Sequence, residues 1–469
     1  MEDLVKLTRK SRLHNKNEHD HSIPTLMSYN LGEFLGQILG RGIGGIYLFF
    51  FETELLLGGG FIIAANIIYS IWNAVNDPVL GYYTGKPTRW TKKWGKFFPW
   101  IVISGIPYII SYVALLFAPS SWPQWGIFAW MLLSLCLTDT FSSIHSVSQV
   151  GLYPTKFFTE RDRRRSGQVN VIIGTLGTVV AFLVPPFLYS FGDIPSYRRL
   201  AIYIGIFAIF IWFLMLPGVK PDKQSLKIEQ EQETDTSFWR VLKTALKQKN
   251  FMIYLIGFLC YSIWVAMITT SIPYYVKHIL VAEAGLQTII WVFYLGGTLI
   301  SLPLWNWIAK KFGFVKLFGI CLIFMGLGTI PLAFFTNLYV VYGTFFILGF
   351  FLGGFWAAWL PIFGLVMDEV FYDTKKLSTG VYLGIRTFFS RFEIIFRTLI
   401  FIGIHKLTRF NPAVVLQPNL ANFGIFLHAS YIPSAIALIG AIIFLLLFKI
   451  SKEKQVLIKE FVQQSRMGI

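Results

Sequence analysis

The chain has 469 residues, of which 55% are hydrophobic and only 14% are charged, and its mean hydropathy is +0.60. No soluble globular protein of this length needs so large an apolar fraction, so the composition excludes that class. The formal net charge is +17. Because the cations are spread over many short loops rather than gathered in one basic domain, they indicate membrane topology and not a nucleic-acid partner.

Apolar segments long enough to cross a bilayer core of roughly 30 Å recur along nearly the whole chain. We predict an all-α integral membrane protein with twelve transmembrane helices in two six-helix bundles. The expected spans lie at about 27–51, 57–85, 99–118, 124–154, 168–192, 197–217, 251–276, 285–309, 315–335, 338–369, 379–407 and 425–450.

The polar segment 218–250 interrupts this series after the sixth span and is rich in Lys, Gln and Glu. We interpret it as a cytoplasmic linker with an amphipathic helix from about Ser237. The predicted organisation is therefore an N-terminal tail (1–26), a first bundle (27–217), the linker (218–250), a second bundle (251–450) and a C-terminal tail (451–469).

The orientation follows from the distribution of Lys and Arg. The two termini and the loops after the even-numbered spans carry 32 of the 41 cations, and the opposite loops carry five. The positive-inside rule then places both termini in the cytoplasm. The first 22 residues lack a signal-peptide pattern, so we expect a multi-pass protein of the plasma membrane that contacts membrane lipids and requires no protein partner.

A short motif repeats between the halves. Lys92-Lys93-Trp94-Gly95 recurs as Lys310-Lys311-Phe312-Gly313, each time after the second span of its half. Six plus six spans with matching loops are typical of the major facilitator superfamily. This architecture predicts alternating access, in which the two halves rock about a central cavity.

The second span has a polar face. Asn66, Ser70, Asn73 and Asp77 are spaced by 4, 3 and 4 residues and share one side of a helix. An ionised carboxylate inside a membrane costs about 3 kcal/mol or more, so it usually faces a cavity, a partner or an ion. Asp77 with Asn73 predicts a coupling-ion site for Na⁺ or H⁺. An ion pair between Asp77 and loop cations is the alternative.

The eleventh span is the most heavily charged, with Arg386, Arg391, Glu393 and Arg397. These four charges cost about 12 kcal/mol, whereas the Leu, Ile and Phe residues of the span return only about 6 kcal/mol. Such a helix needs partners. Arg386, Ser390, Glu393 and Arg397 share a face and predict a neutralising stripe. Arg391 lies off that stripe and is a candidate for cavity contacts, with an interhelical ion pair or snorkelling as alternatives.

Further polar and aromatic residues inside the spans are candidates for the substrate cavity. Glu33 and Gln37 could line the cavity or, alternatively, bridge between helices. Trp356 and Trp359 could stack on sugar rings or, alternatively, belong to the packed core. The candidates are Glu33, Gln37 and Arg41 of the first span, Asp139, Ser142, Ser146 and Gln149 of the fourth, Trp356 and Trp359 of the tenth, and Arg386 and Glu393 of the eleventh.

Charged residues at the cytoplasmic ends of the spans predict a gate. Asp368, Glu369 and Asp373 close the tenth span opposite Lys375 and Lys376. We expect salt bridges there that hold one side shut. The predicted gate residues are Arg89, Lys92, Lys93, Lys96, Asp368, Glu369 and Asp373. The sequence has no nucleophile elbow, HExxH, Walker loop or metal-ligand cluster, so we expect neither an enzyme nor a cofactor beyond the coupling ion.

Residues 76–102, NDPVLGYYTGKPTRWTKKWGKFFPWIV, resemble the region from span 2 to span 3 of the glycoside-pentoside-hexuronide:cation symporters. That family reads roughly NDP-x-x-G followed by RWGK-x-x-PW, and Lys93 stands where it often has Arg. YLFFFETE (47–54), GLYPTKFFTERDRRR (151–165) and VMDEVFYDTKKLSTGVYLGIRTFFSR (366–391) resemble the family too. The resemblance implies a major facilitator fold and symport of a sugar or sugar acid with Na⁺, Li⁺ or H⁺.

The resemblance also carries site residues. Asp77 matches a carboxylate of the family's cation site, Asn73 stands in place of a second carboxylate, and Arg391 falls where a lysine is implicated. Ile38 and Ser146 stand where family members have sugar-coordinating aspartates, so a galactoside is not supported. The additional arginines suggest an anionic substrate such as a hexuronate. More distantly the family resembles sodium-coupled lysophosphatidylcholine carriers, so a lysophospholipid or another amphiphile is the alternative substrate.

Overall fold

The computed structural model describes residues 21–42, 44–157, 159–222, 225–226, 243–374, 379–450, 454, 456–458 and 460–461. Within these ranges the chain is helical and contains no strand. The expected amphipathic helix from about Ser237, the residues Lys375 and Lys376, and most of both tails lie outside the described residues.

The first half contains six long helical segments. They are α2 (Ile23–Gly42), which continues through α3 (Tyr47–Phe49) and the π-helix η1 (Phe50–Glu54); α4 (Gly59–Thr84); α6 (Phe98–Ala114) with η2 (Leu115–Phe117); α7 (Gln124–Lys156); α8 (Glu160–Leu183) with α9 (Pro185–Leu188); and α10 (Ile194–Val219). The short helix α5 (Thr91–Trp94) lies in the basic loop between α4 and α6.

The second half repeats this series. It contains α13 (Lys249–Tyr274) with η3 (Tyr275–Ile279); α14 (Leu286–Phe312); α15 (Phe314–Thr329) with η4 (Ile330–Ala333); α16 (Leu338–Thr374); α17 (Thr379–Ser390) and α18 (Phe392–Leu407); and α19 (Asn419–Phe426) with η5 (Leu427–Tyr431) and α20 (Ile432–Leu447).

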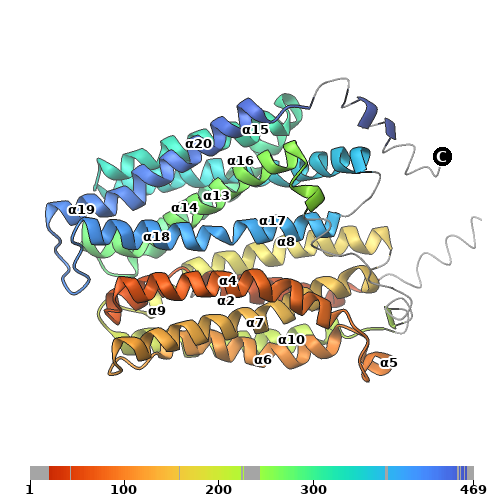
Figure 1. Ribbon diagram of the computed structural model, residues 1–469, viewed down its shortest axis with the longest axis horizontal. Coiled ribbons are helices and arrows are strands. Elements are labelled where there is room, and N and C mark those ends of the chain that lie inside the picture. Colours follow the sequence, from red (N-terminus) through yellow and green to blue (C-terminus); the bar gives the residue numbers. More distant parts are fainter. Residues whose placement is uncertain are drawn as a thin grey trace, which may run out of the picture.

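Ten helical segments among the described residues are long and apolar enough to cross a membrane. The other two expected spans, α4 and the pair α17 and α18, run alongside these ten (Figure 1). They fall short of the apolar criterion because α4 carries three asparagines and an aspartate, while four charges lie in the eleventh span. The all-α membrane fold is confirmed, and these two crossings stay a prediction that rests on their position.

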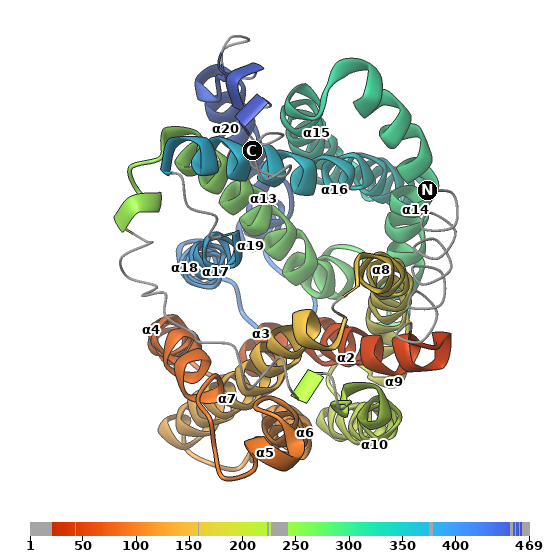
Figure 2. The same ribbon diagram turned by 90° about the vertical axis from the view of Figure 1, so that its right-hand side faces the viewer.

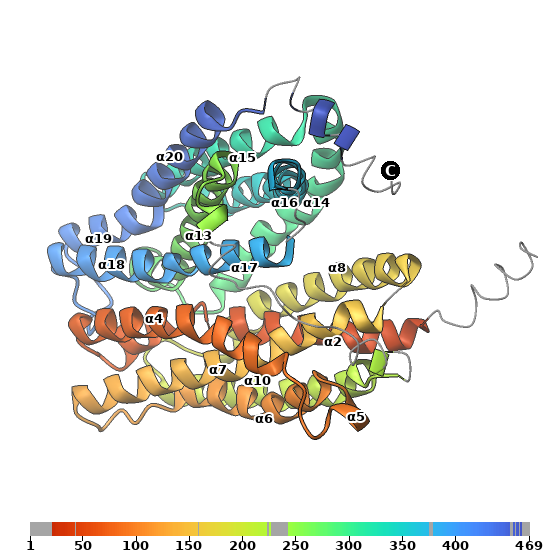
Figure 3. The same ribbon diagram turned by 45° about the vertical axis from the view of Figure 1, so that its right-hand side comes forward.

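The two halves form separate groups of helices (Figures 2 and 3). Each half has its own main hydrophobic cluster, one centred on the second half and one on the first. The halves meet along two pairs of helices, α4 with α18 and α8 with α14. The two charged or asparagine-rich segments are thus brought to the interface between the halves, where their polar side chains need not face lipid.

One end of the molecule collects the cation-rich loops. The segments that follow α4, α7, α10, α14 and α20 all lie at this end, on the right of Figure 1. We call it the basic end, and the end that carries α9 and α19 the opposite end. The equivalent loops of the repeat have the same backbone: Gly95 and Gly313 have φ of 74° and 84°, a region that favours glycine.

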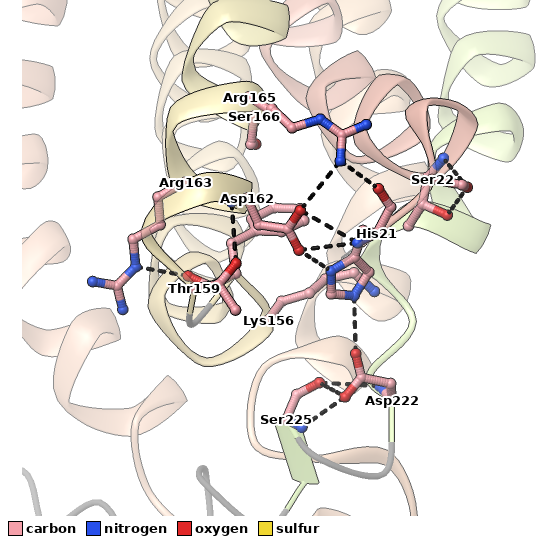
Figure 4. A network of polar contacts seen from close by, with 12 residues as sticks. His21, Ser22, Lys156, Thr159, Asp162, Arg163, Arg165, Ser166, Asp222 and Ser225 are labelled. Atoms are coloured by element: carbon pink, nitrogen blue, oxygen red, sulfur yellow. Dashed lines mark hydrogen bonds and ion pairs between the residues drawn. The ribbon is translucent and has the colours of Figure 1, made fainter. Parts of the chain in front are cut away.

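A polar cluster ties three segments of the first half together at the basic end (Figure 4). His21, just before α2, places Nδ1 2.7 Å from Asp162 of α8 and Nε2 3.1 Å from Asp222, which follows α10. The hydrogen bond to Asp222 raises the pKa of His21, against burial that lowers it, and Asp162 adds to the rise. Burial raises the pKa of Asp222, but the hydrogen bonds from His21 and Ser225 lower it overall.

The cluster predicts a pH-dependent stability. Because the pKa of His21 is higher in the folded protein, its stabilisation is complete below the usual value of about 6.5 and is lost as pH rises through the raised value. We expect the melting temperature of detergent-solubilised protein to fall between pH 6 and pH 9, and to fall less in His21→Gln and in Asp222→Asn. Equal losses in the wild type and both variants would contradict this role of His21.

Candidate functional site: a central cavity between the halves

A cavity of about 590 Å³ lies between the halves. Its walls come mainly from α2, α6 and α7 of the first half and from the region around Arg391 in the second. This volume is within the usual range for small-molecule sites. Seven of the residues proposed from the sequence line it: Glu33, Asp139, Ser142, Ser146, Gln149, Arg391 and Glu393.

Two carboxylates from neighbouring helices lie at the centre of the site. Asp139 of α7 accepts hydrogen bonds from the side-chain amides of Asn73, at short range, and of Asn76, at 3.0 Å, both on α4. Asp77 of α4 accepts a short hydrogen bond from Ser143 of α7. The Asn73 amide N–H groups thus connect the predicted pair of Asn73 and Asp77 to Asp139, and the coupling-ion role of the pair stays a prediction.

Arg391 connects this pair to the second half. Its guanidinium lies 3.9 Å from the carboxylate of Asp77 and also acts electrostatically on Asp139. The side chain lines the cavity, and Arg391 lies at the junction between α17 and α18 with helical backbone angles, φ −65° and ψ −22°. The backbone N–H of Arg391 is shared between the carbonyls of Thr387, at 3.3 Å, and Phe388, at 3.2 Å, and α18 starts one residue later. Arg391 Nε has no hydrogen-bond partner among the described residues.

The polar face of the first span forms a ladder along α2. Gln37 donates to Glu33 at 2.6 Å, and Arg41 donates to Gln37 at 2.5 Å. Thr178 of α8 adds a hydrogen bond to Gln37 at 3.2 Å. The two predicted roles, cavity lining and bridging between helices, are divided between these residues. Glu33 lines the cavity, whereas Gln37 bridges to α8.

Several proposed cavity residues lie elsewhere. Trp356 donates to Tyr261 at 2.9 Å, and Trp359 packs within the second half, so both belong to its core packing and not to the cavity lining. The guanidinium of Arg386 lies 4.6 Å from the ring centres of both Phe258 and Trp359. Glu393 interacts electrostatically with Arg397, as expected for the predicted neutralising stripe, whereas the contacts described for Arg386 are with aromatic rings. The stripe as a whole stays a prediction.

The contacts described for two acidic residues of the predicted cytoplasmic gate, Glu369 and Asp373, lie within the second half. Glu369 accepts from Asn250 at 2.9 Å and from Lys454 at 2.8 Å, and Asp373 accepts from Lys454 at 3.1 Å. All four residues belong to the second half, so these contacts hold α13 and α16 to the chain after α20. The contacts shown for Arg89 and Lys93 are with Trp90 and Trp94 of their own loop.

A buried polar cluster closes the opposite end instead. Glu52 of η1 contacts His405 Nδ1 at 2.7 Å and accepts from the Tyr274 hydroxyl at 2.5 Å. His405 Nε2 lies 3.2 Å from His428 Nε2, and Ser271 Oγ lies 2.8 Å from His428 Nδ1. Two neutral rings satisfy all these contacts if each donates from one nitrogen and accepts at the other. One carboxylate of the first half is thus held by three spans of the second.

Two further contacts reinforce this closure. Lys277 lies 3.4 Å from Glu54, and Arg397 donates to the Tyr47 hydroxyl at 2.9 Å. Glu52 and His405 are 6% and 4% exposed, so the contacts exclude water. The opposite end is thus closed by contacts between the halves, whereas the ion pairs described at the basic end each lie within one half.

The sequence reasoning missed Asn76, Ser143 and the closure at the opposite end. Asn76 precedes Asp77 and sits one turn after Asn73, so helical spacing from Asn73 was the available signal. Ser143 is four residues after Asp139 and could have been found in the same way. Glu52 lies in the stretch YLFFFETE that resembles the symporter family, but nothing in that stretch indicates its partner. For His405 and His428 no local pattern gave a signal, because the contacts join residues 353 and 23 positions apart.

Comparisons with known proteins show which family the chain belongs to. Residues 28–452 match the model of a family described as MFS/sugar transport protein. The chain belongs to this family. It is therefore a multi-pass membrane transporter for small molecules and not an enzyme, and the predicted major facilitator fold and symporter family are confirmed.

Two relatives illustrate the range of the family. Sodium-dependent lysophosphatidylcholine symporter 1 of Gallus gallus is 25% identical over 431 residues, which cover 82% of this chain and 78% of that protein. Lactose permease of Lactobacillus delbrueckii subsp. bulgaricus is 23% identical over 64% of this chain and 50% of its own length. The matched region thus spans only half of that permease.

Solved structures agree on the fold. The D-xylose-proton symporter superposes with a TM-score of 0.65 at 14% identity, covering 91% of this chain and 98% of that one. A bacterial homolog to the human lysosomal transporter Spinster, in an inward-facing and unoccupied conformation, gives a TM-score of 0.61 at 12% identity over 94% and 99% of the two chains.

The closure predicts the effect of Glu52→Gln. Removing the charge weakens the hydrogen bonds to His405 and Tyr274, each worth about 1.5–3 kcal/mol when one partner is charged. The reporter is Ser142→Cys, in a background without the three native cysteines. We expect this cysteine to react with an impermeant maleimide added at the opposite end at least about tenfold faster in Glu52→Gln than in the protein with Glu52. Asp193→Asn, which breaks an exposed ion pair with Arg199 at that end, is the control. Unchanged labelling would show that Glu52 does not hold this end shut.

Proposed function

We propose that the protein takes up a sugar-like solute together with a cation by alternating access. The observation that carries this proposal is the carboxylate pair Asp77 and Asp139, placed beside Arg391 in a central cavity that is closed at one end. Residues 23–219 would rock against residues 249–447, with the interface of α4 and α18 as a moving contact.

The coupling ion is proposed to bind between α4 and α7. Asp77 and Asp139 supply carboxylate oxygens, and Asn73 Oδ1 is buried without a hydrogen-bond partner among the described residues. Hard oxygen ligands of this kind suit Na⁺, and the same carboxylates suit a proton. Arg391 acts as an internal counter-cation for Asp77 while the ion is absent. Arrival of the ion releases the guanidinium, which links ion binding to the second half.

The cavity lining favours a hydrophilic substrate. Six tyrosines face it, together with serine, glutamine and asparagine side chains that can donate to or accept from hydroxyl groups. The lining contains three carboxylates, Glu33, Asp139 and Glu393, against two guanidinium groups, Arg391 and Arg397, and Asp77, which is outside the lining, pairs with Arg391. This excess of negative charge favours a neutral sugar or glycoside over the hexuronate suggested by the arginines alone.

A lysophospholipid is the second candidate. The relative from Gallus gallus is named for lysophosphatidylcholine transport. Tyrosine faces and carboxylates can also hold a quaternary ammonium group. However, the aliphatic side chains of the lining are Leu115, Leu135, Val150 and Ile394, which come from three different helices and offer little continuous surface for an acyl chain.

The proposed location is the plasma membrane, with the basic end and both termini on the cytoplasmic side. The cation-rich loops at one end of the structure support this orientation. In this orientation the closure around Glu52 faces outward.

Ion coupling predicts distinct effects of two substitutions. Asp77→Asn and Asp139→Asn should each lower accumulation driven by a Na⁺ or proton gradient in proteoliposomes by at least about tenfold, because an ion ligand is lost. Equilibrium exchange of labelled substrate should persist in Asp77→Asn. Glu283→Gln, an exposed carboxylate in the loop before α14, is the matched control. Undiminished accumulation in both variants would make these carboxylates structural.

Substrate class is tested with a competition panel. Neutral glycosides, pentosides, hexuronates and lysophosphatidylcholine are offered to the same proteoliposomes under each gradient. We expect a neutral sugar to be accumulated and to compete with its labelled form, with hexuronates weaker because of the carboxylates. Competition by lysophosphatidylcholine and by none of the sugars would instead establish the second candidate.

A further inference from the structure

Two grooves on the outer surface are built from equivalent parts of the repeat. The first-half groove, about 760 Å³, lies between the loop after α4, the start of α6 and the end of α10; Trp90, Trp94, Phe98, Phe213, Leu216 and Lys220 line it. The second-half groove, about 560 Å³, lies between the loop after α14, the start of α15 and the chain after α20; Phe312, Phe314, Lys316, Phe448 and Lys449 line it. It also has a wall from α16, at Pro361, Ile362 and Leu365, for which the described lining of the first-half groove has no counterpart. Neither shares a lining residue with the central cavity.

Each groove combines an apolar floor with a cationic rim. In the first-half groove Trp94 stacks on Phe98 at 5.5 Å, and Phe213 is 58% exposed. Lys93 and Lys220 lie 5.4 Å and 5.8 Å from the ring centre of Trp94. The side chains of Lys93 and Lys220 therefore approach one aromatic ring from the loop and from the end of α10. A ligand that lies on this ring meets both ammonium groups.

The second-half groove has the same plan. Lys311 lies 5.6 Å from the ring centre of Phe312, and the exposed side chains of Lys316 and Lys449 belong to the lining. Lys449 follows the twelfth span as Lys220 follows the sixth. The aromatic residues of the repeated motif, Trp94 and Phe312, thus contribute to two similar sites, each where α6 or α15 begins and α10 or α20 ends.

These features specify the occupant. The floors are formed by helices on the outer side of each half (Figure 2), where α6 and α10 or α15 and α20 meet the bilayer. Apolar surface alone gives no preference there, because lipid tails are as apolar as the groove. Lysines at the headgroup level give the groove a preference for anionic lipids, because each cation near an anionic surface contributes about 1 kcal/mol. Basic pockets between spans are known to bind anionic headgroups.

We propose that each groove binds one anionic phospholipid of the leaflet that faces the basic end. An acyl chain lies along the aromatic floor. The phosphate lies between Lys220 and the side chains of Arg89 and Lys93 in the first groove, and between Lys449 and Lys316 in the second. The two lipids fill the junctions between the third and sixth span of each half and fix the basic loops against the membrane. This proposal does not depend on the transported substrate.

The test uses full-length protein, delipidated in mild detergent and titrated with phosphatidylglycerol or phosphatidylcholine before native mass spectrometry. We expect two phosphatidylglycerol molecules to be retained in preference to phosphatidylcholine. Arg89→Gln with Lys220→Gln should remove one, weakening it about 30-fold, which is two charges at about 1 kcal/mol each. Lys316→Gln with Lys449→Gln should remove the other and leave the first.

The control pair is Lys243→Gln with Lys247→Gln, which removes the same charge from exposed positions outside both grooves. Retention of both lipids in this pair supports the proposal. If the control pair lost phosphatidylglycerol as strongly as the groove variants, the attraction would be diffuse and electrostatic. If the wild type retained phosphatidylcholine as well as phosphatidylglycerol, the grooves would be apolar and without headgroup selectivity. A dimer mass that the groove variants abolish would assign the surface to a second copy of the chain. Each of these three results overturns the proposal.

Discussion

The central cavity depends on the ion pair between Arg391 and Asp77, with Asp139 as its neighbour. A charge in the membrane interior costs about 3 kcal/mol. The segments that carry Asp77, Asp139 and Arg391 therefore cannot turn these side chains toward lipid without that cost. The pair lies 3.9 Å apart across the contact between the two halves. The residues that most need a partner are therefore satisfied only when the halves associate. The same contact separates when the transporter changes state, so its energy must be exchanged with that of an ion.

The two ends of the molecule differ in how their polar residues are used. At the opposite end Glu52, Glu54 and Tyr47 of the first half are bound by His405, Lys277 and Arg397 of the second. At the basic end the described ion pairs stay within one half, as His21 with Asp162 and Lys454 with Glu369. At the basic end each half is therefore held together by ion pairs between its own segments. Such a half can move as a rigid body about the closed opposite end.

Much of the fold could be predicted from the sequence because apolar length and cation distribution are local properties. The positions of eleven helices needed no knowledge of their neighbours, and the repeat of Lys92-Lys93-Trp94-Gly95 located both halves. The eleventh span was located correctly but expected to be continuous. The structure describes two helices that meet at Arg391, which pairs with Asp77, while Arg386 lies on the aromatic faces of Phe258 and Trp359. Local spacing could not predict which partner each arginine has.

The site could be predicted only one helix at a time. Spacing along α4 identified Asn73 and Asp77, and spacing along α7 identified Asp139, but no spacing says which amide will meet which carboxylate. That pairing depends on the register between α4 and α7, which sets Asn73 and Asn76 opposite Asp139 and sets Asp77 opposite Ser143. Contacts such as Glu52 with His405 lie still further beyond local pattern, because two separate halves must close before either partner is buried.

The cost of polar groups in lipid also explains where the chain allows irregular structure. The two expected spans that are not among the ten most apolar segments, α4 and the pair α17 and α18, provide one of the helix contacts across the halves, that of α4 with α18. An unsatisfied backbone or charge is tolerated there because it faces a cavity or a partner rather than hydrocarbon. The lipid-facing helices α6, α10, α15 and α20 instead keep their cations at their ends. Charge within the membrane therefore marks the path of ion and solute, and charge at its edge marks the contact with lipid headgroups.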